Sequence, residues 1–305
     1  MSKTVQIVEE VKKAVVGKDD VIVQSLMAIL AGGHILLEDV PGVGKTTLAL
    51  AFARALALDC RRMQFTPDVL PSDITGFSIY RKETGEMEYQ PGAVLCNLFL
   101  ADELNRATAR TQSALLEAME EKQVTVDGVT HAVPRPFVII ATQNPTGASG
   151  TQLLPDSQMD RFMVRLSLGY PSADAELELL RRKQKGALLK NVQQVMDRRE
   201  LLALRKEVRT LYISDSVLRY IVELNAATRE HADILQGASP RATVALAQMA
   251  RASAFLRGRD YVTPADVQRV YCCTIGHRLR LAPQAENADS LLKEILRTVS
   301  APQIR

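Results

Sequence analysis

A glycine-rich turn between an apolar strand and a helix constrains the fold of this chain more than any other feature. The turn covers residues 39–46, the predicted strand runs from His34 to Glu38, and the predicted helix runs from Thr46 to Leu58. A strand, a glycine-rich turn and a helix in this order let backbone N–H groups close around phosphate oxygens at the positive end of the helix dipole. We therefore predict a phosphate-binding loop in an α/β fold.

The residue types in this loop suit a nucleoside triphosphate. Lys45 adds positive charge near the β- and γ-phosphates, and Thr46 offers its hydroxyl to Mg²⁺. Asp39 departs from the pattern G-x-x-x-x-G-K-[ST] at its first position, so an ordinary glycine-rich turn is the alternative. The residues expected to contact the nucleotide here are Pro41, Gly42, Val43, Gly44, Lys45, Thr46 and Thr47.

A second motif supplies two adjacent carboxylates. Residues 98–103 read LFLADE, an apolar strand that ends in Asp102 and Glu103. Open α/β sheets bind ligands outside the carboxyl ends of their strands, so both side chains fall where a nucleotide would bind. Asp102 would hold Mg²⁺ through water, and Glu103 would orient and polarise the attacking water. A helix cap is the alternative interpretation of this pair.

The number of residues between the two motifs favours an ATPase with an inserted strand. Lys45 and Asp102 are 57 positions apart (102 − 45), which leaves room for the predicted strand Cys60 to Phe65. Together with the glutamate that follows the aspartate, this spacing disfavours small-molecule kinases. Strands that alternate with helices predict a parallel sheet covered on both faces. The other predicted strands are Asn97 to Ala101, Phe137 to Thr142 and Met163 to Leu168.

Two hairpins and a change of pattern complete the predicted organisation. One hairpin pairs residues 77–81 with 86–90, and the other turns at Asp127-Gly128, a strong hairpin signal. After Pro171 the strand signals stop, and helices begin at Ser239-Pro240 and Thr263-Pro264. We predict a nucleotide-binding αβα core over residues 1–170 and a smaller all-helical domain over residues 171–305.

The charge is divided unevenly along the 305 residues. The net charge is +3, but residues 1–170 carry 16 Lys+Arg against 20 Asp+Glu, whereas residues 171–305 carry 22 against 15, giving −4 and +7. The basic side chains of the second part are spread along amphipathic helices, and the chain has no Trp. A nucleic-acid partner is therefore not expected.

Composition also argues against export, a membrane span and a transition-metal site. The N-terminus lacks the apolar stretch of a signal peptide, and the apolar run from Val21 to Leu30 is too short to cross a bilayer. We expect a cytoplasmic protein. The four cysteines and four histidines show no metal-ligand spacing.

Three segments together resemble the MoxR family of AAA+ ATPases. They are residues 36–46 (LLEDVPGVGKT), 101–107 (ADELNRA) and 160–162 (DRF), and the resemblance extends from residue 1 to about residue 290. Phosphate loops of this family commonly lack glycine at the position of Asp39. The resemblance implies an AAA+ P-loop core with Walker A and Walker B motifs, a smaller helical lid domain, and ATP or ADP with Mg²⁺ as ligands.

The resemblance also implies roles for polar residues outside these two motifs. Asn144, after an apolar strand, matches the first sensor, which contacts the γ-phosphate and the attacking water; an amide cap is the alternative. Arg241, in the first turn of a helix, matches the second sensor; a surface arginine is the alternative. Val16 and Gly17 match the family's adenine-side contact.

Arg161 resembles the arginine finger, which reaches the nucleotide of the neighbouring subunit. A permanently charged guanidinium suits the charge that accumulates on the γ-phosphate oxygens. A salt bridge to Asp160 or Asp156 is the alternative, and Arg165 is a weaker candidate for the finger. The hairpins resemble the helix-2 insert, within residues 66–92, and the pre-sensor-1 insert, residues 123–133, which would face a central pore.

Three functions remain open from the sequence. The first is a ring-forming ATPase, implied to be a hexamer, that acts like a chaperone on a protein client or on a partner with a von Willebrand factor A domain. The second is the motor subunit of a magnesium chelatase, which usually carries longer insertions than this chain. The third is a nucleic-acid translocase, which the dispersed charges disfavour.

Overall fold

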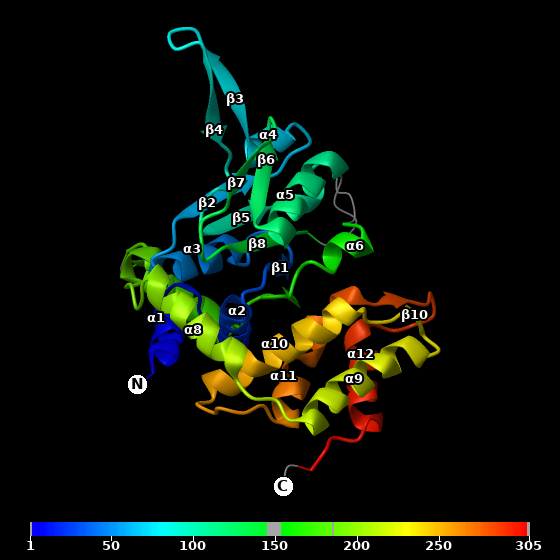
Figure 1. Cartoon of the computed structure of the whole chain (residues 1–305). Coiled ribbons are helices and arrows are strands. Elements are labelled where there is room, and N and C mark those ends of the chain that lie inside the picture. The colour runs from blue at the N-terminus through cyan, green and yellow to red at the C-terminus, as the bar shows by residue number, and fades with distance from the viewer. Residues whose placement is uncertain (1, 145–153, 185, 304–305) are drawn as a thin grey trace. The chain divides into compact units, whose positions relative to one another are not determined.

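The computed structural model describes residues 2–144, 154–184 and 186–303 (Figure 1). The elements before residue 145 are α1 (Lys3–Ala14), α2 (Asp19–Ala31), β1 (Ile35–Glu38), α3 (Lys45–Ala55), β2 (Cys60–Gln64), α4 (Pro71–Thr75), β3 (Gly76–Arg81), β4 (Glu86–Pro91), β5 (Leu98–Asp102), η1 (Leu104–Arg106), α5 (Ala109–Glu121), β6 (Gln123–Val126), β7 (Val129–Ala132) and β8 (Val138–Gln143). The elements after residue 153 are α6 (Asp156–Met159), β9 (Val164–Leu166), α7 (Ala173–Gln184), η2 (Leu188–Asn191), α8 (Arg198–Thr210), α9 (Asp215–Glu230), β10 (Ile234–Gln236), α10 (Pro240–Leu256), α11 (Pro264–Ile275), η3 (Gly276–Arg278), β11 (Arg280–Leu281) and α12 (Ala288–Thr298).

A five-stranded sheet with the order β2-β5-β8-β1-β9 carries both sequence motifs. β5 runs parallel to β2 and to β8, with Leu98 opposite Cys60 on one side and Val138 on the other. β5 and β8 are buried along their whole length and begin with apolar runs, as expected of central strands covered on both faces. β2 contains the exposed Arg61 and Arg62 and lies at the sheet edge. The predicted parallel sheet and inserted strand are confirmed.

Both predicted hairpins are present. β3 pairs antiparallel with β4, and β6 with β7. Asp127 and Gly128 both have positive φ, 51° and 78°, as a tight two-residue hairpin turn requires. Figure 1 shows that the β3–β4 hairpin projects beyond the sheet. The ring of Tyr89 on β4 stacks on His131 on β7, with centroids 3.7 Å apart and planes 11° from parallel.

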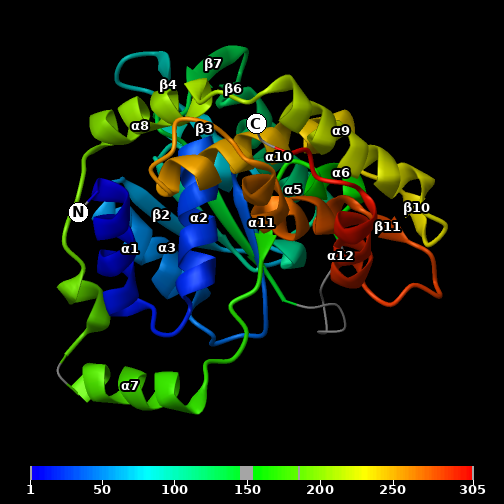
Figure 2. The same ribbon diagram turned by 90° about the horizontal axis from the view of Figure 1, so that it is seen from below.

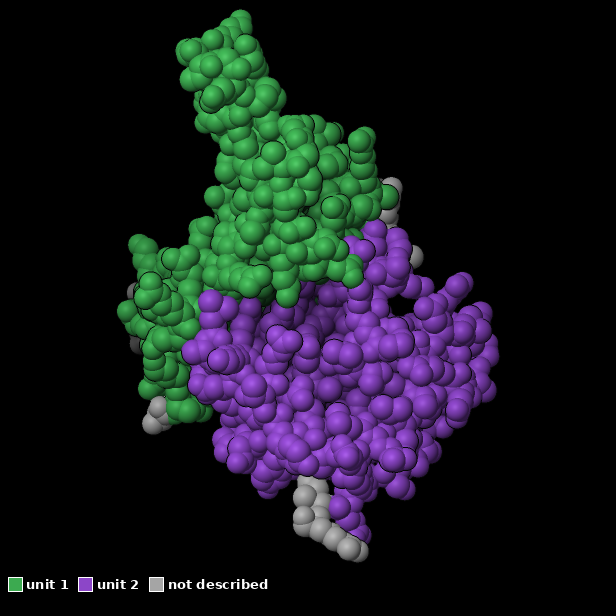
Figure 3. All heavy atoms as spheres, in the orientation of Figure 1, with its two compact units in different colours: residues 1–22, 36–154, 167–201 green, residues 23–35, 155–166, 202–305 purple. Residues whose placement is uncertain are grey.

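The chain forms two compact units, drawn in different colours in Figure 3. Unit 1 comprises Met1–Ile22, Leu36–Leu154 and Ser167–Leu201, and unit 2 comprises Val23–Ile35, Pro155–Leu166 and Leu202–Arg305. The predicted domain boundary between residues 170 and 171 stays a proposal.

Unit 2 contains mostly helices, and α10 packs on α9 and α11 (Figure 2). The predicted helix starts are confirmed: Ser239 caps α10 by accepting a hydrogen bond from the N–H of Ala242, and Thr263 begins α11 with a capping box. One difference is the antiparallel pair of β10 and β11, which the sequence analysis does not predict. Strands of three and two residues are too short to show an alternating pattern. Among the described residues, no helix is long and apolar enough to cross a bilayer.

Candidate active site

The glycine-rich loop leaves the N-terminus of α3 open to a ligand. Gly42 and Gly44 have φ of 87° and 102°, in the left-handed region that glycine adopts without strain. A Cβ at either position would meet no atom within 4 Å, so the backbone conformation and not lack of space requires glycine. Gly44 is the N-cap of α3 and provides no side-chain cap. The first turn of α3 begins at Lys45, and its N–H groups therefore receive no hydrogen bond from a side chain at position 44. These N–H groups can bind an anion.

Lys45 lies buried under this loop. Its Nζ donates hydrogen bonds to the carbonyl oxygen of Asp39 and to Oδ1 of Asn144, 3.4 Å away. Burial lowers the pKa of Lys45, and nearby carboxylates, Asp39 first and then Asp102, act in the opposite direction. The ammonium is thus held by oxygen atoms close to the place where the loop would bind phosphates.

Asp39, the residue that departs from the phosphate-loop pattern, has a structural role. Its buried carboxylate accepts hydrogen bonds from Ser167 Oγ at 2.8 Å, from the N–H of Gly169 at 3.0 Å and from the N–H of Leu168. It therefore connects the start of the loop to residues 167–169, which follow β9. Sequence reasoning missed this role, and the acidic residue at the position where the phosphate-loop pattern has glycine is the local signal of it.

We expect Asp39→Ala to lower the free energy of unfolding by about 2–3 kcal/mol, because the buried N–H of Leu168 and the half-buried N–H of Gly169 lose their charged acceptor. Asp39→Asn keeps one acceptor oxygen and should lose less. Urea unfolding of both variants measures the difference. Asp68→Ala removes an exposed carboxylate and serves as the control. Equal stability of Asp39→Ala and the control would contradict the structural role.

Asp102 at the end of β5 is the centre of a polar cluster. Its carboxylate accepts hydrogen bonds from Thr46 Oγ1 at 3.4 Å and from Thr142 Oγ1 at 2.6 Å. It also pairs with Arg62 Nη2 at 2.8 Å, and Arg62 is half exposed, so solvent screens this ion pair. The structure thus brings together Thr46 and Asp102, the two predicted Mg²⁺ ligands. A hydroxyl and a carboxylate are hard oxygen donors of the kind that Mg²⁺ takes alongside phosphates and water.

Glu103 follows Asp102 in a left-handed backbone conformation, with φ 57° and ψ 46°. Its N–H donates to Thr142 Oγ1 at 2.9 Å, and its carboxylate accepts from Asn144 Nδ2 at 3.3 Å and from Arg106 Nη1 at 3.0 Å. Glu103 makes no side-chain cap at η1, and the Asn144 amide contacts Glu103 and Lys45. The helix-cap alternative therefore does not hold for Glu103 at η1.

Sequence reasoning missed three residues of this cluster: Arg62, Arg106 and Thr142. Arg62 contacts Asp102 only because β2 lies beside β5, and Thr142 contacts it only because β8 lies on the other side. Arg106 is three residues after Glu103, and this spacing is the one local sequence feature that could have indicated their ion pair.

The remaining predicted site residues are in other parts of the chain, and their roles stay predictions. Gly17 has φ +70°, and a Cβ there would lie 2.7 Å from that of Ala175, so the approach of α7 also requires glycine. Val16 is half buried beside it. Arg161 follows α6 and lies in unit 2. Arg165 on β9 and Arg241 in the first turn of α10 are in unit 2 as well.

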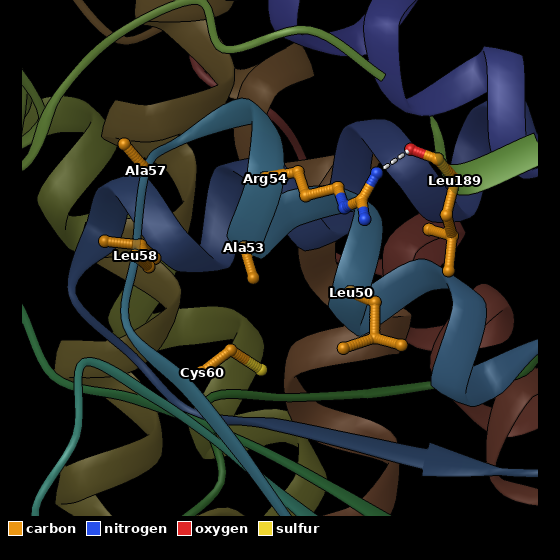
Figure 4. Close-up of a pocket in the computed structure, with 7 residues that line it drawn as sticks. All are labelled: Leu50, Ala53, Arg54, Ala57, Leu58, Cys60 and Leu189. Atoms are coloured by element: carbon orange, nitrogen blue, oxygen red, sulfur yellow. Dashed lines mark hydrogen bonds between the residues drawn. The ribbon is translucent and has the colours of Figure 1, made fainter. Parts of the chain in front are cut away.

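A separate pocket of about 390 Å³ in unit 1 contains none of the predicted site residues (Figure 4). In Figure 4 the Arg54 guanidinium reaches the carbonyl of Leu189, to which it donates a hydrogen bond at 2.5 Å. Burial raises the pKa of the Cys60 thiol to about 11, so this cysteine is not a nucleophile at neutral pH. The other residues that line the pocket are Leu50, Ala53, Ala57 and Leu58.

Known proteins match almost the whole chain. Residues 34–164 match the ATPase family associated with various cellular activities (AAA), and residues 226–298 match the AAA lid domain. The protein YeaC of Bacillus subtilis, described as uncharacterized, is 46% identical over 299 residues, which are 97% of this chain and 93% of the relative. Chaperone MoxR1 of Mycobacterium tuberculosis is 39% identical over 308 residues, 97% of this chain and 81% of the relative.

A solved structure shares the fold. The crystal structure of a protein from Cytophaga hutchinsonii, provisionally described as an ATPase, superimposes with a TM-score of 0.91 at 41% identity and covers 99% of this chain and 95% of that chain. The AAA match includes the glycine-rich loop, both carboxylates and Asn144.

Proposed function

Because the chain belongs to the MoxR family of AAA+ ATPases, we propose that it hydrolyses ATP to ADP and phosphate in a ring of like subunits. The cycle would remodel or activate a protein partner, and the name of the relative MoxR1, a chaperone, supports this class of function. The observation that carries the proposal is the cluster of Lys45, Thr46, Asp102, Glu103 and Asn144 around one end of the sheet.

The proposed hydrolysis assigns one task to each member of this cluster. Thr46, and Asp102 through water, would hold Mg²⁺, which would supply charge neutralisation at the phosphates. Lys45 supplies a further positive charge to the β- and γ-phosphates. Glu103 accepts a proton from the attacking water as general base. Asn144, within hydrogen-bond distance of Glu103 and Lys45, orients the base and contacts the γ-phosphate.

The residues of unit 2 and the N-terminal turn complete the proposal. Arg161 is the arginine finger for the neighbouring subunit, and Arg241 is the second sensor. Val16 and Gly17 contact the adenine. The ring is a hexamer of cytoplasmic subunits, and its partner is a protein client or a protein with a von Willebrand factor A domain.

The proposal predicts ATP-dependent assembly that weakens as salt rises. In a ring the second domain of one subunit abuts the first domain of its neighbour, and these parts carry +7 and −4. Sedimentation of the ATP-bound protein should give a ring at low ionic strength and smaller species at high ionic strength. Phosphate release should accompany the ring. A chain that neither binds nor hydrolyses ATP would overturn the proposal, and a ring indifferent to salt would contradict the charge argument.

The same assay separates the alternatives. Stimulation of phosphate release by a porphyrin together with chelatase subunits would instead support a magnesium chelatase motor. Stimulation by DNA or RNA would support a translocase. The proposed function requires that neither addition changes the rate.

A further inference from the structure

A buried arginine in unit 2 makes hydrogen bonds to the backbone on both sides of Arg161. Arg278 belongs to η3, and its side chain is 3% exposed. One of its nitrogens, Nη2, donates to the carbonyl oxygen of Asp160 at 3.1 Å and to that of Phe162 at 2.8 Å. The guanidinium therefore holds the residues immediately before and after Arg161, and it is itself fixed by the bond from Nη1 to the Thr274 carbonyl at 2.8 Å.

A second residue of η3 also makes a hydrogen bond to this backbone segment. His277 is buried, and its Nε2 lies 3.0 Å from the carbonyl oxygen of Phe162, so Nε2 carries the proton and donates it. Burial holds the pKa of His277 well below its ordinary value, and the adjacent Arg278 charge acts in the same direction. The imidazole is therefore neutral at physiological pH, and the ring of Phe162 is fully buried.

The Asp160 carboxylate connects these η3 contacts to α10. One side of the carboxylate pairs with Arg278 Nε at 2.8 Å. Ser239 Oγ donates to the same carboxylate and lies 3.1 Å from Oδ2 and 3.3 Å from Oδ1, the oxygen that pairs with Arg278. Ser239 is the N-cap of α10, the helix whose second residue is Arg241. Asp160 thus lies next to Arg161 in the chain, and its partner Ser239 lies two residues before Arg241.

The two contacts of Asp160 differ in strength. The contact to Arg278 is an ion pair with a buried guanidinium, and breaking it would leave the charge of Arg278 uncompensated in the interior. The bond to Ser239 comes from a neutral hydroxyl and borders a pocket of about 400 Å³ that Asp160, Ser239 and Arg278 all line. Water in that pocket can replace the hydroxyl, so this second contact can open at a smaller cost.

We propose that Asp160 and Arg278 are positioning residues that fix Arg161, and that the Ser239–Asp160 bond couples the N-terminus of α10 to the arginine that serves the neighbouring subunit. The inference rests on the proposed function, because it takes Arg161 as the finger and Arg241 as the second sensor. A shift of α10 would change the position of Arg161 through a single side chain, that of Asp160. A displacement of about 1 Å at a reacting group can change a rate about 100-fold, so a loosened finger is enough to slow the neighbour.

The test uses subunits that contribute an arginine finger to a neighbour but do not hydrolyse ATP themselves. Lys45→Ala subunits lack ATP turnover but keep Arg161, and Arg161→Ala subunits lack the finger but keep the phosphate loop. In mixed rings the rescued phosphate release reports the finger of the Lys45→Ala donor. The donor then receives one further substitution, either Ser239→Gly or Arg278→Lys.

Ser214→Gly in the donor is the matched control. Ser214 is the N-cap of α9 in the same unit and accepts from the Val217 N–H as Ser239 accepts from the Ala242 N–H, but its hydroxyl contacts Ser216. Glycine is tolerated at N-caps at a cost of a few tenths of a kcal/mol, so both variants should fold. Urea midpoints of the two donors should agree, which separates positioning from a general loss of stability.

We expect the Ser214→Gly donor to rescue as well as the Lys45→Ala donor, the Ser239→Gly donor to rescue several-fold less, and the Arg278→Lys donor at least about 10-fold less. Equal rescue by the Ser239→Gly and Ser214→Gly donors would overturn the coupling. Full rescue by a folded Arg278→Lys donor would overturn the positioning role. Absence of rescue by the unmodified Lys45→Ala donor, with co-assembly demonstrated, would instead refute Arg161 as the finger.

Discussion

Lys45→Ala is expected to abolish tight ATP binding, whereas Glu103→Gln is expected to preserve binding and stop turnover. The first substitution removes a buried charge next to the phosphate loop, and losing a hydrogen bond to a charged group weakens binding about 10- to 100-fold. The second removes only the carboxylate that we propose as general base, worth about 10²- to 10⁴-fold in rate. Titration with a fluorescent ATP analogue and a phosphate-release assay measure the two effects separately.

The glutamine at position 103 can keep the contact to Asn144, so the cluster should stay assembled. Glu117→Gln, at an exposed position of α5, is the control for an ordinary loss of one carboxylate. If Glu103→Gln and Lys45→Ala lost nucleotide binding equally, Glu103 could not be assigned as the base.

Arg161→Ala should leave ATP binding nearly intact and reduce turnover by about 10³-fold or more, as for other arginine fingers. In the proposed ring, the site that Arg161 would serve belongs to the next subunit. An Arg161→Ala subunit keeps a complete phosphate loop, and a Lys45→Ala subunit still presents Arg161. Each variant should be inactive alone, but rings that mix them should regain part of the wild-type rate.

Arg165→Ala is the comparison variant for this experiment, because Arg165 lies four residues further along on β9. It should retain turnover if Arg161 is the finger. Failure of the mixed rings to recover, with co-assembly of the two variants demonstrated, would make Arg161 a local structural residue and would reopen the case for Arg165.

The sequence predicts local features of this protein well because they depend on neighbouring residues. Apolar runs at residues 98–101 and 138–141 indicate buried central strands, and Asp127-Gly128 indicates a tight hairpin turn. Both motif carboxylates follow such a run, so their place at the end of β5 could be predicted together with the strand.

The sequence does not predict contacts between residues that only the fold brings together. The carboxylate of Asp39 meets backbone groups 129 and 130 positions further along the chain, and no local pattern reports such a distance. Arg62 looks like an exposed residue of an edge strand until β2 is placed beside β5. Arg278 looks like one of many basic residues until its burial between carbonyl groups is known.

A protein engineer who ranks residues by backbone energy alone would choose glycine or asparagine for position 103. The left-handed conformation there costs most residues about 1–2 kcal/mol, and glycine adopts it without that cost. Such a replacement would also delete the carboxylate that contacts Asn144 and Arg106. Thermostability screens of this protein would therefore reward variants that lack the proposed general base, and a useful screen would have to score turnover and heat resistance together.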